Sequence, residues 1–282
     1  MRLVALFLRE IRIEHTLFAL PFAYVGAILA ARGIPSLAAL GWITLAVLGA
    51  RTAAMAANRF FDREIDARNP RTARRALASG RLAPATMVWA GIAGLALLLW
   101  AAWMLNPLCV KLMPVAALLL LAYPLCKRFT WTTHFVLGAV DGLAPLGAYI
   151  GIAGEVTLPA ILLFAAVTIW VAGFDIIYAL MDLGVDREQG IRSLPARFGE
   201  ASGHVLPILL HAAMLLLLAG AGMLAGAGRT YYLGVAAVAV LIVYEEYLFR
   251  SGANLFVINE RVFISNMTFS VFFLLTTVGG YL

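Results

Sequence analysis

Residues 157–186 read TLPAILLFAAVTIWVAGFDIIYALMDLGVD, an apolar stretch that leads into acidic residues. Its first part, residues 157–181, carries one charged side chain, Asp175. A helix needs about 20 predominantly apolar residues to cross a bilayer. This stretch therefore predicts a transmembrane helix with Asp182 and Asp186 at its polar end.

The same pattern recurs from one end of the chain to the other. Of the 282 residues, 63% are hydrophobic and 13% are charged, whereas soluble domains carry about 25% charged residues. No polar stretch is long enough for a separate soluble domain. We predict an all-α protein, a single membrane domain over residues 1–282 with about nine transmembrane helices. The predicted spans are 15–32, 38–60, 84–104, 108–126, 132–153, 157–181, 203–226, 230–249 and 262–281.

Charge predicts the orientation of the spans. Most of the 21 basic residues flank the predicted helices on one side, where the two long polar connections also lie (about 61–84 and 182–202). Basic loops stay in the cytoplasm, so we expect a multi-pass protein of the inner (cytoplasmic) membrane with its N-terminus and both long connections in the cytoplasm. The net charge of +6 then follows from topology, and no nucleic-acid partner is implied.

Two acidic motifs begin these long connections, about 120 residues apart, like halves of a repeat. Steps of four residues place the first set on one helix face, and steps of three and four do the same for the second. Carboxylates at the end of an apolar helix are costly and mark function. The first set is Asn58, Asp62 and Asp66; the second is Asp175, Tyr178, Asp182 and Asp186.

Four facing carboxylates would repel one another unless cations separate them. Mg²⁺ prefers oxygen ligands and is commonly shared between carboxylates and substrate phosphates. Basic side chains on the same side would offset the charge of a diphosphate. The apolar surroundings suit a diphosphate with a long hydrocarbon tail and a chemistry of allylic ionisation. The basic candidates are Arg63, Arg71, Arg75, Lys127, Arg128 and Arg192.

The segment Asn58-Arg-Phe-Phe-Asp62-Arg-Glu-Ile-Asp66 resembles the first motif of the UbiA-type prenyltransferases, NxxxDxxxD. Residues 175–186 resemble the second motif, 193–199 the segment after it, and Tyr123-Pro-Leu-Cys-Lys127-Arg128 the lysine loop of the family. The resemblance covers nearly the whole chain and implies nine transmembrane helices. One departure is Ala76, where the family often has proline after the arginine equivalent to Arg75.

The resemblance also implies roles for the motif residues. Asn58, Asp62, Asp66, Asp182 and Asp186 would hold Mg²⁺ and the diphosphate. Arg63, Arg75 and Lys127 would contact the diphosphate, with Arg128 and Arg192 as further candidates, and Tyr178 would line the reaction chamber. The substrates would be a polyprenyl diphosphate and an aromatic acid, met in the membrane lipid.

Two acceptors remain open, 4-hydroxybenzoate of the ubiquinone route and a dihydroxynaphthoate of a menaquinone route. Arg51 lies seven residues before Asn58 on the same helix face. It would neutralise the acceptor carboxylate or, alternatively, pair with Asp141 or Asp175. Other prenyl transfers of the family are an alternative, as are a divalent-cation transporter and a structural subunit with an inactive site.

Several other residues are predicted to serve packing alone. Glycine pairs four residues apart let helices approach closely, and Gly138/Gly142 and Gly147/Gly151 have this spacing. The cysteines and histidines show no metal-ligand spacing, so we expect packing or interfacial roles for Cys109, Cys126, His15, His134, His204 and His211.

Overall fold

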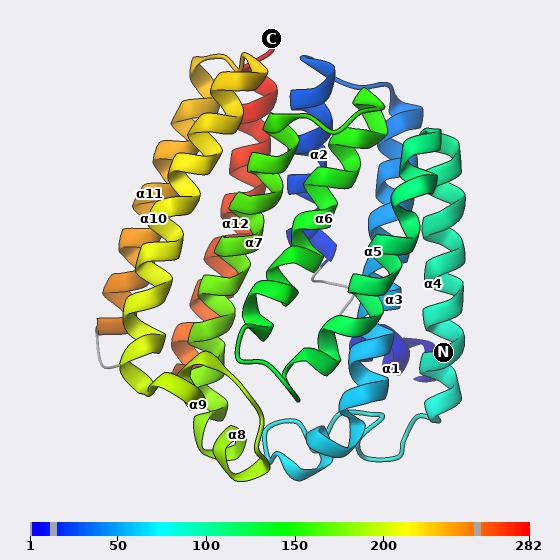
Figure 1. Cartoon of the computed structure of the whole chain (residues 1–282), viewed down its shortest axis with the longest axis vertical. Helices are drawn as coiled ribbons and strands as arrows, with labels where there is room; N and C mark the ends of the chain where they lie inside the picture. The colour runs from blue at the N-terminus through cyan, green and yellow to red at the C-terminus, as the bar shows by residue number, and fades with distance from the viewer. Residues whose placement is uncertain (1, 12–15, 251–254) are drawn as a thin grey trace.

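A computed structural model describes residues 2–11, 16–250 and 255–282. Within these ranges the chain is helical and has no strand, which confirms the predicted class (Figure 1). The helices are α1 (Arg2–Glu10), α2 (Thr16–Ala31), α3 (Leu37–Arg68), α4 (Pro84–Leu105), α5 (Pro107–Cys126), α6 (Thr133–Ala153), α7 (Leu158–Ala179), α8 (Leu183–Gln189), α9 (Leu194–Phe198), α10 (Glu200–Ala225), α11 (Arg229–Arg250) and α12 (Leu255–Gly279).

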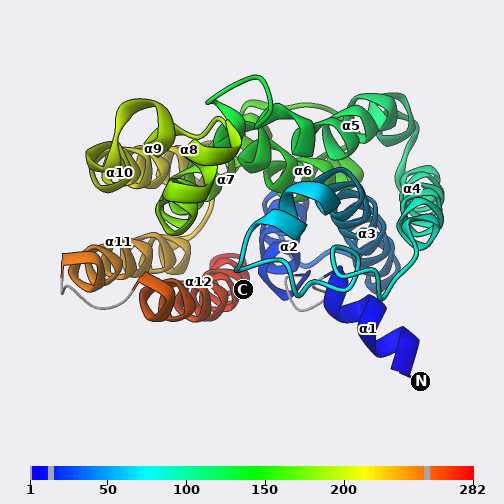
Figure 2. The same ribbon diagram turned by 90° about the horizontal axis from the view of Figure 1, so that it is seen from below.

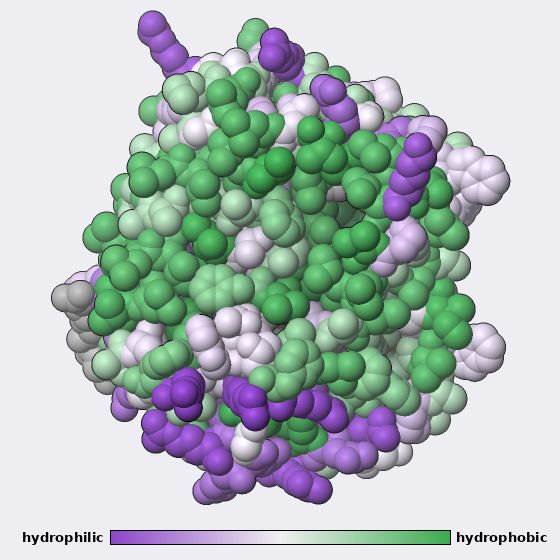
Figure 3. All heavy atoms as spheres, viewed as in Figure 1, coloured by the Kyte–Doolittle hydropathy of each residue, from purple (hydrophilic) through white to green (hydrophobic). Residues whose placement is uncertain are grey.

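The predicted spans correspond to these helices. In the described part of the chain, 8 helices are long and apolar enough to cross a membrane, and α2 adds a shorter apolar run, Ala19–Ala31. Figure 3 shows a broad apolar belt and a concentration of hydrophilic side chains at the lower end of the molecule. That end carries α1, α8, α9 and the connection after α3 (Figure 1).

The short helix α2 lies at the centre of the bundle, against α6, α12 and α3 (Figure 2). Its Phe22 is 2% exposed, and its ring centroid lies 4.9 Å from that of Trp170 on α7 and 5.9 Å from that of Phe273 on α12. Aromatic pairs at this separation add to the packing energy of a core. These contacts hold α2 against both α7 and α12.

Close contact between α6 and α7 depends on glycine. A Cβ atom on Gly138 would overlap the carbonyl oxygen of Thr168, and one on Gly142 would lie 2.8 Å from the carbonyl oxygen of Phe164. The predicted packing role of this pair is confirmed. Gly147 differs, because a Cβ there would meet nothing within 4 Å. The prediction of a packing role is wrong for Gly147, which faces a cavity instead.

Helix α3 carries the whole first acidic motif, as its spacing predicts, and extends further than the predicted span. The predicted span ended near residue 60, but α3 continues to Arg68 because residues 61–68 contain no helix breaker. Pro70 stops the helix: the residue before a proline is driven out of the α region, and Asn69 has φ −94° and ψ 119°.

The second motif is broken where one continuous face was predicted. Helix α7 ends at Ala179, a 3₁₀ turn spans Leu180–Asp182, and α8 begins at Leu183. The turn has fewer residues per turn than an α-helix, so Asp182 and Asp186 are rotated about the helix axis relative to Asp175. Gly190, with φ 67°, then ends α8.

Helix α1 is fastened to the connection after α3 through Glu10, whose side chain is 6% exposed. Its carboxylate accepts hydrogen bonds from the backbone N–H of Ala76 at 2.8 Å and of Leu77 at 3.3 Å. Arg59 donates from Nε to the Glu10 carbonyl at 3.0 Å and lies 3.9 Å from its carboxylate. Glu10 therefore links α1, α3 and the connection after α3.

We expect Glu10→Ala to lower the free energy of unfolding by about 3–5 kcal/mol, because it leaves a buried arginine charge without its carboxylate. The measurement is the thermal midpoint of the purified protein in detergent. Glu155→Ala, in the exposed connection between α6 and α7, is the control. Equal midpoints for the two variants would contradict the assigned role of Glu10.

Candidate active site

The last turns of α3 present Asn58, Asp62 and Asp66 toward the polar end of the bundle. Asp62 is 2% exposed and Asp66 is 6% exposed. Asn58 donates from Nδ2 to Asp62 Oδ2 at 3.0 Å. Carboxylates as buried as these need compensating partners.

Basic side chains from two other segments supply those partners. Lys127, directly after α5, lies with Nζ 2.6 Å from Asp62 Oδ2. Arg75, in the connection after α3, donates from one nitrogen to both oxygens of Asp66, at 2.8 and 2.7 Å. Both acids of the first motif are therefore neutralised from outside their own helix.

The second motif is held by the connection that follows the first. Asp182 accepts from Asn69 Nδ2 at 3.0 Å and from Arg71 Nε at 2.9 Å, and a second Arg71 nitrogen completes a bidentate pair. Burial acts to lower the pKa of Arg71, but the hydrogen bonds and charge of Asp182 outweigh it, and the pKa is raised. Arg71 thus stays charged and joins the two motifs.

Asp186 completes the group from α8. It is 8% exposed and accepts from Ser193 Oγ at 3.1 Å. The backbone N–H of Arg192 donates to the carbonyl of Lys127 at 2.8 Å, so the segments after α5 and α8 run together. The charge of Lys127 acts on both Asp62 and Asp186. Lys127 therefore contacts the first motif through its ammonium group and the segment after α8 through its carbonyl.

Other predicted site residues make different contacts. Arg63 donates to the carbonyl of Phe60 at 2.9 Å and stacks on the Phe60 ring, 4.8 Å from its centroid. Arg128 bonds the carbonyl of Phe61, and Arg192 donates to the carbonyl of Phe129 at 2.6 Å. Tyr178 packs against Phe174, with ring centroids 6.2 Å apart. Among the contacts of the described residues, Arg63, Arg128 and Arg192 form no ion pair with the four motif aspartates.

Sequence reasoning missed Asn69, Ser193 and His134 as parts of the site. The sequence predicts a packing or interfacial role for His134, but its Nδ1 lies 2.6 Å from Asp175 Oδ2 and its Nε2 accepts from the backbone N–H of Leu194 at 3.2 Å. Asn69 could have been predicted from the sequence, because it precedes Pro70 and therefore lies where the helix that carries the first motif ends. The contacts of Ser193 and His134 depend on the tertiary fold.

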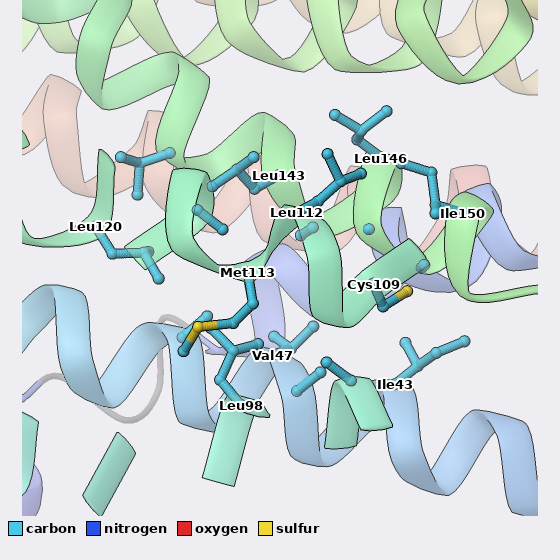
Figure 4. A pocket seen from close by; sticks show the side chains of 18 of the residues that line it. Ile43, Val47, Leu98, Cys109, Leu112, Met113, Leu120, Leu143, Leu146 and Ile150 are labelled. Carbon is cyan, nitrogen blue, oxygen red and sulfur yellow. The ribbon is translucent and has the colours of Figure 1, made fainter. Parts of the chain in front are cut away.

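An apolar cavity of about 220 Å³ lies between α3, α4, α5 and α6. Figure 4 shows its wall, which includes Ile43, Leu98, Cys109, Met113 and Leu146. The charged lining residues are Arg51 and Asp141, which form an ion pair at 3.1 Å. Pairing with Asp141, one of the two alternatives for Arg51, is therefore confirmed, and the buried Nε donor of Arg51 has no hydrogen-bond partner among the described residues.

The sequence profile described as the UbiA prenyltransferase family matches residues 19–267. The chain belongs to this family. It is therefore a membrane prenyltransferase, which decides against the cation transporter.

Known relatives of this prenyltransferase align with it over most of their own sequence and most of this chain. A 4-hydroxybenzoate octaprenyltransferase from Marinobacter nauticus is 36% identical over 86% of this chain and 83% of its own. A protein of the same name from Alkalilimnicola ehrlichii is 33% identical over 80% of this chain and 76% of its own.

Solved UbiA structures share the fold. The apo structure of a UbiA homolog from Aeropyrum pernix matches with a TM-score of 0.86 at 33% identity, over 96% of this chain and 99% of that one. A UbiA homolog from Archaeoglobus fulgidus, solved with GPP and Mg²⁺, has a TM-score of 0.67 at 20% identity, over 97% and 99% of the two chains.

The donor set of this UbiA-family site fits Mg²⁺. Asp62 Oδ1 is buried without a hydrogen-bond partner among the described residues, an expensive arrangement unless a cation completes it. Across the described ranges, no three His, Cys, Asp or Glu side chains gather closely enough to hold an ion by themselves. Mg²⁺ usually takes one or two carboxylates together with substrate phosphates and water, so a protein-only cage is not required.

Proposed function

We propose that this prenyltransferase moves a polyprenyl group from a polyprenyl diphosphate onto the ring of an aromatic acid, 4-hydroxybenzoate or a dihydroxynaphthoate, in ubiquinone or menaquinone synthesis. Mg²⁺ is the proposed cofactor. The observation that carries the proposal is the contact of Asn69 and Arg71 with Asp182, which joins the two acidic motifs at one end of a bundle that also holds an apolar cavity. The names of the relatives support the aromatic acid, with 4-hydroxybenzoate as the first acceptor to test.

The two motifs would bind the diphosphate end of the donor. Asn58, Asp62, Asp66, Asp182 and Asp186 would hold Mg²⁺, which would neutralise the diphosphate and stabilise pyrophosphate as a leaving group. Lys127 and Arg75, which now pair with Asp62 and Asp66, would turn to the phosphate oxygens and offset the remaining charge. Arg63, Arg128, Arg192 and Tyr178 remain proposed members of the site.

The cavity would hold apolar parts of the substrates away from water. Its lining is almost entirely aliphatic apart from the Arg51–Asp141 pair. A water-poor site protects a carbocation from hydrolysis. By the concentration of basic residues at the motif end, we propose that this end faces the cytoplasm from the inner membrane.

The test uses membranes that contain the protein, Mg²⁺, an all-trans polyprenyl diphosphate and the two acids in competition. Membranes with Asp182→Asn serve as the blank. We expect one acid to be prenylated and the blank to be silent. If neither acid reacts although the diphosphate binds, the acceptor class is wrong and other prenyl acceptors of the family come forward.

Arg51 is proposed to bind the acceptor carboxylate through the nitrogen that has no partner. We expect Arg51→Gln to raise the KM for the acid about 10-fold or more, because a charged hydrogen bond contributes about 1.5–3 kcal/mol. The KM for the polyprenyl diphosphate should not change. Steady-state kinetics measure both, and Asp141→Asn tests the ion pair separately. An unchanged KM for the acid in Arg51→Gln would restrict Arg51 to its pairing with Asp141.

A further inference from the structure

The contact between α6 and α7 near the second motif contains a polar pair to which the proposed function gives no role. His134 is 2% exposed, and its Nδ1 lies 2.6 Å from Asp175 Oδ2. The backbone N–H of Leu194 donates to the other ring nitrogen at 3.2 Å. A nitrogen that accepts a hydrogen bond carries no proton, so the proton of this neutral imidazole lies on Nδ1. His134 therefore donates to Asp175.

This arrangement fixes one carboxylate oxygen and leaves the other side of Asp175 open. The Asp175 side chain is 30% exposed, whereas that of His134 is 3% exposed. A carboxylate inside a membrane bundle is costly and marks function. A histidine that is itself held by a backbone N–H fixes the direction of the carboxylate, as supporting groups do in active sites.

Asp175 lies at a depth between the motif aspartates and Arg51, the residue proposed to bind the acceptor carboxylate. Asp175 precedes Asp182 by two helical turns, roughly 10 Å along the axis, and Arg51 precedes Asp62 by three turns, roughly 16 Å. Helices α3 and α7 run in the same direction (Figure 1), so Asp175 lies at a depth between the aspartates at the helix ends and Arg51.

We propose that Asp175 is the catalytic base that takes the ring proton from the aromatic acceptor, and that His134 is its positioning residue. This inference rests on the proposed function. The C1–O bond of the prenyl diphosphate breaks and its electron pair leaves with pyrophosphate. A ring carbon beside the hydroxyl donates an electron pair to C1, which forms the C–C bond. The proton of that ring carbon passes to the Asp175 carboxylate, and the C–H electron pair restores the aromatic ring.

A base is needed at this point because the ring regains its aromaticity only when the proton leaves the carbon that has formed the new bond. A positioned proton acceptor contributes about 10²–10⁴-fold to such a step. The rival acceptor of the proton is the leaving pyrophosphate, and a kinetic isotope effect separates the two.

The experiment compares ordinary 4-hydroxybenzoate with 4-hydroxybenzoate deuterated at both ring positions beside the hydroxyl. If the dihydroxynaphthoate is the preferred acid, its ring-deuterated form is used. We expect Asp175→Asn to lower kcat about 10²-fold or more without raising the KM for the polyprenyl diphosphate. The deuterated acid should react more slowly than the ordinary acid in the variant, with a larger isotope effect than in the wild type, because proton removal has become rate-limiting.

Three further variants test whether the loss of rate comes from the missing base or from a structural change. Asparagine can still accept from His134, and His134→Gln provides a second route that leaves Asp175 in place; it should show a smaller loss and the same rise in isotope effect. Asp175→Glu should recover part of the rate. Thr168→Val is the control, because this threonine on the same helix donates only to the carbonyl of Phe164, at 2.7 Å.

Two outcomes would overturn the assignment while the proposed function stands: Asp175→Asn keeps the wild-type kcat, or it loses activity with an unchanged isotope effect. If wild-type membranes prenylate neither acid, the proposed function fails and the base falls with it. The wild-type rate thus distinguishes the two failures.

Discussion

Asp62→Asn is expected to lower kcat/KM for prenyl transfer about 10²–10³-fold, the scale of losing a principal electrostatic group in an active site. Asp62 is 2% exposed, holds Lys127 at 2.6 Å and Asn58 at 3.0 Å, and has one buried oxygen without a partner. Asparagine keeps the shape but removes the charge that would bind a cation. The measurement is the initial rate of prenylation in membranes at matched protein content.

Glu64→Gln is the matched control, since Glu64 lies two residues further along α3 with a side chain that is 75% exposed. We expect it to keep the wild-type rate. Both variants should stay folded in detergent, because asparagine retains the volume of Asp62 and the Lys127 side chain, 23% exposed, can reach water once its carboxylate is removed. An active Asp62→Asn protein would remove the first motif from the proposed chemistry.

Gly138→Ala is expected to lower the free energy of unfolding by about 3 kcal/mol or more, at the upper end of the usual cost of overpacking. The added methyl group would overlap the Thr168 carbonyl oxygen, and a backbone atom cannot move aside as a flexible side chain can. The two helices would have to separate, which would also disturb the His134–Asp175 contact between them. The measurements are the thermal midpoint and the yield of monodisperse protein in detergent.

Gly147→Ala provides the comparison on the same helix. A methyl group there would meet no atom within 4 Å, so the thermal midpoint should stay near that of the wild type. Both substitutions remove a helical glycine, and propensity alone favours alanine by about 1 kcal/mol. A Gly138→Ala protein as stable as Gly147→Ala would show that α6 and α7 can separate at little cost.

Much of this fold can be predicted from the sequence, because a bilayer requires apolar helices of nearly fixed length. The spans follow from that requirement. The end of α3 near Arg68 is also predictable, because a helix usually ends before the residue that precedes a proline, here Pro70. The break at Leu180–Asp182 has no such signal, since no glycine or proline lies within the turn. It is set by tertiary contacts, including the hold of Asn69 and Arg71 on Asp182.

The candidate site was predicted less completely than the fold. Periodicity picked out the aspartates because acids at the ends of apolar helices are rare. Which arginine meets which aspartate could not be predicted, since many basic residues lie at the same end. Arg71 and Arg75 pair with aspartates, whereas Arg63 turns to a backbone carbonyl. The partner of a long side chain depends on differences of a few ångströms in the positions of neighbouring segments, and sequence spacing does not determine these positions.

The anchoring of Glu10 by Ala76 and Leu77 has a consequence for synthesis of the chain. A ribosome releases Glu10 before α2 and α3 have been made, so its carboxylate must wait in water or at the lipid headgroups until both helices have inserted and the chain has returned. Its burial therefore follows the pairing of the first two spans. Helix α1, although made before α2 and α3, packs against them only after both have been inserted.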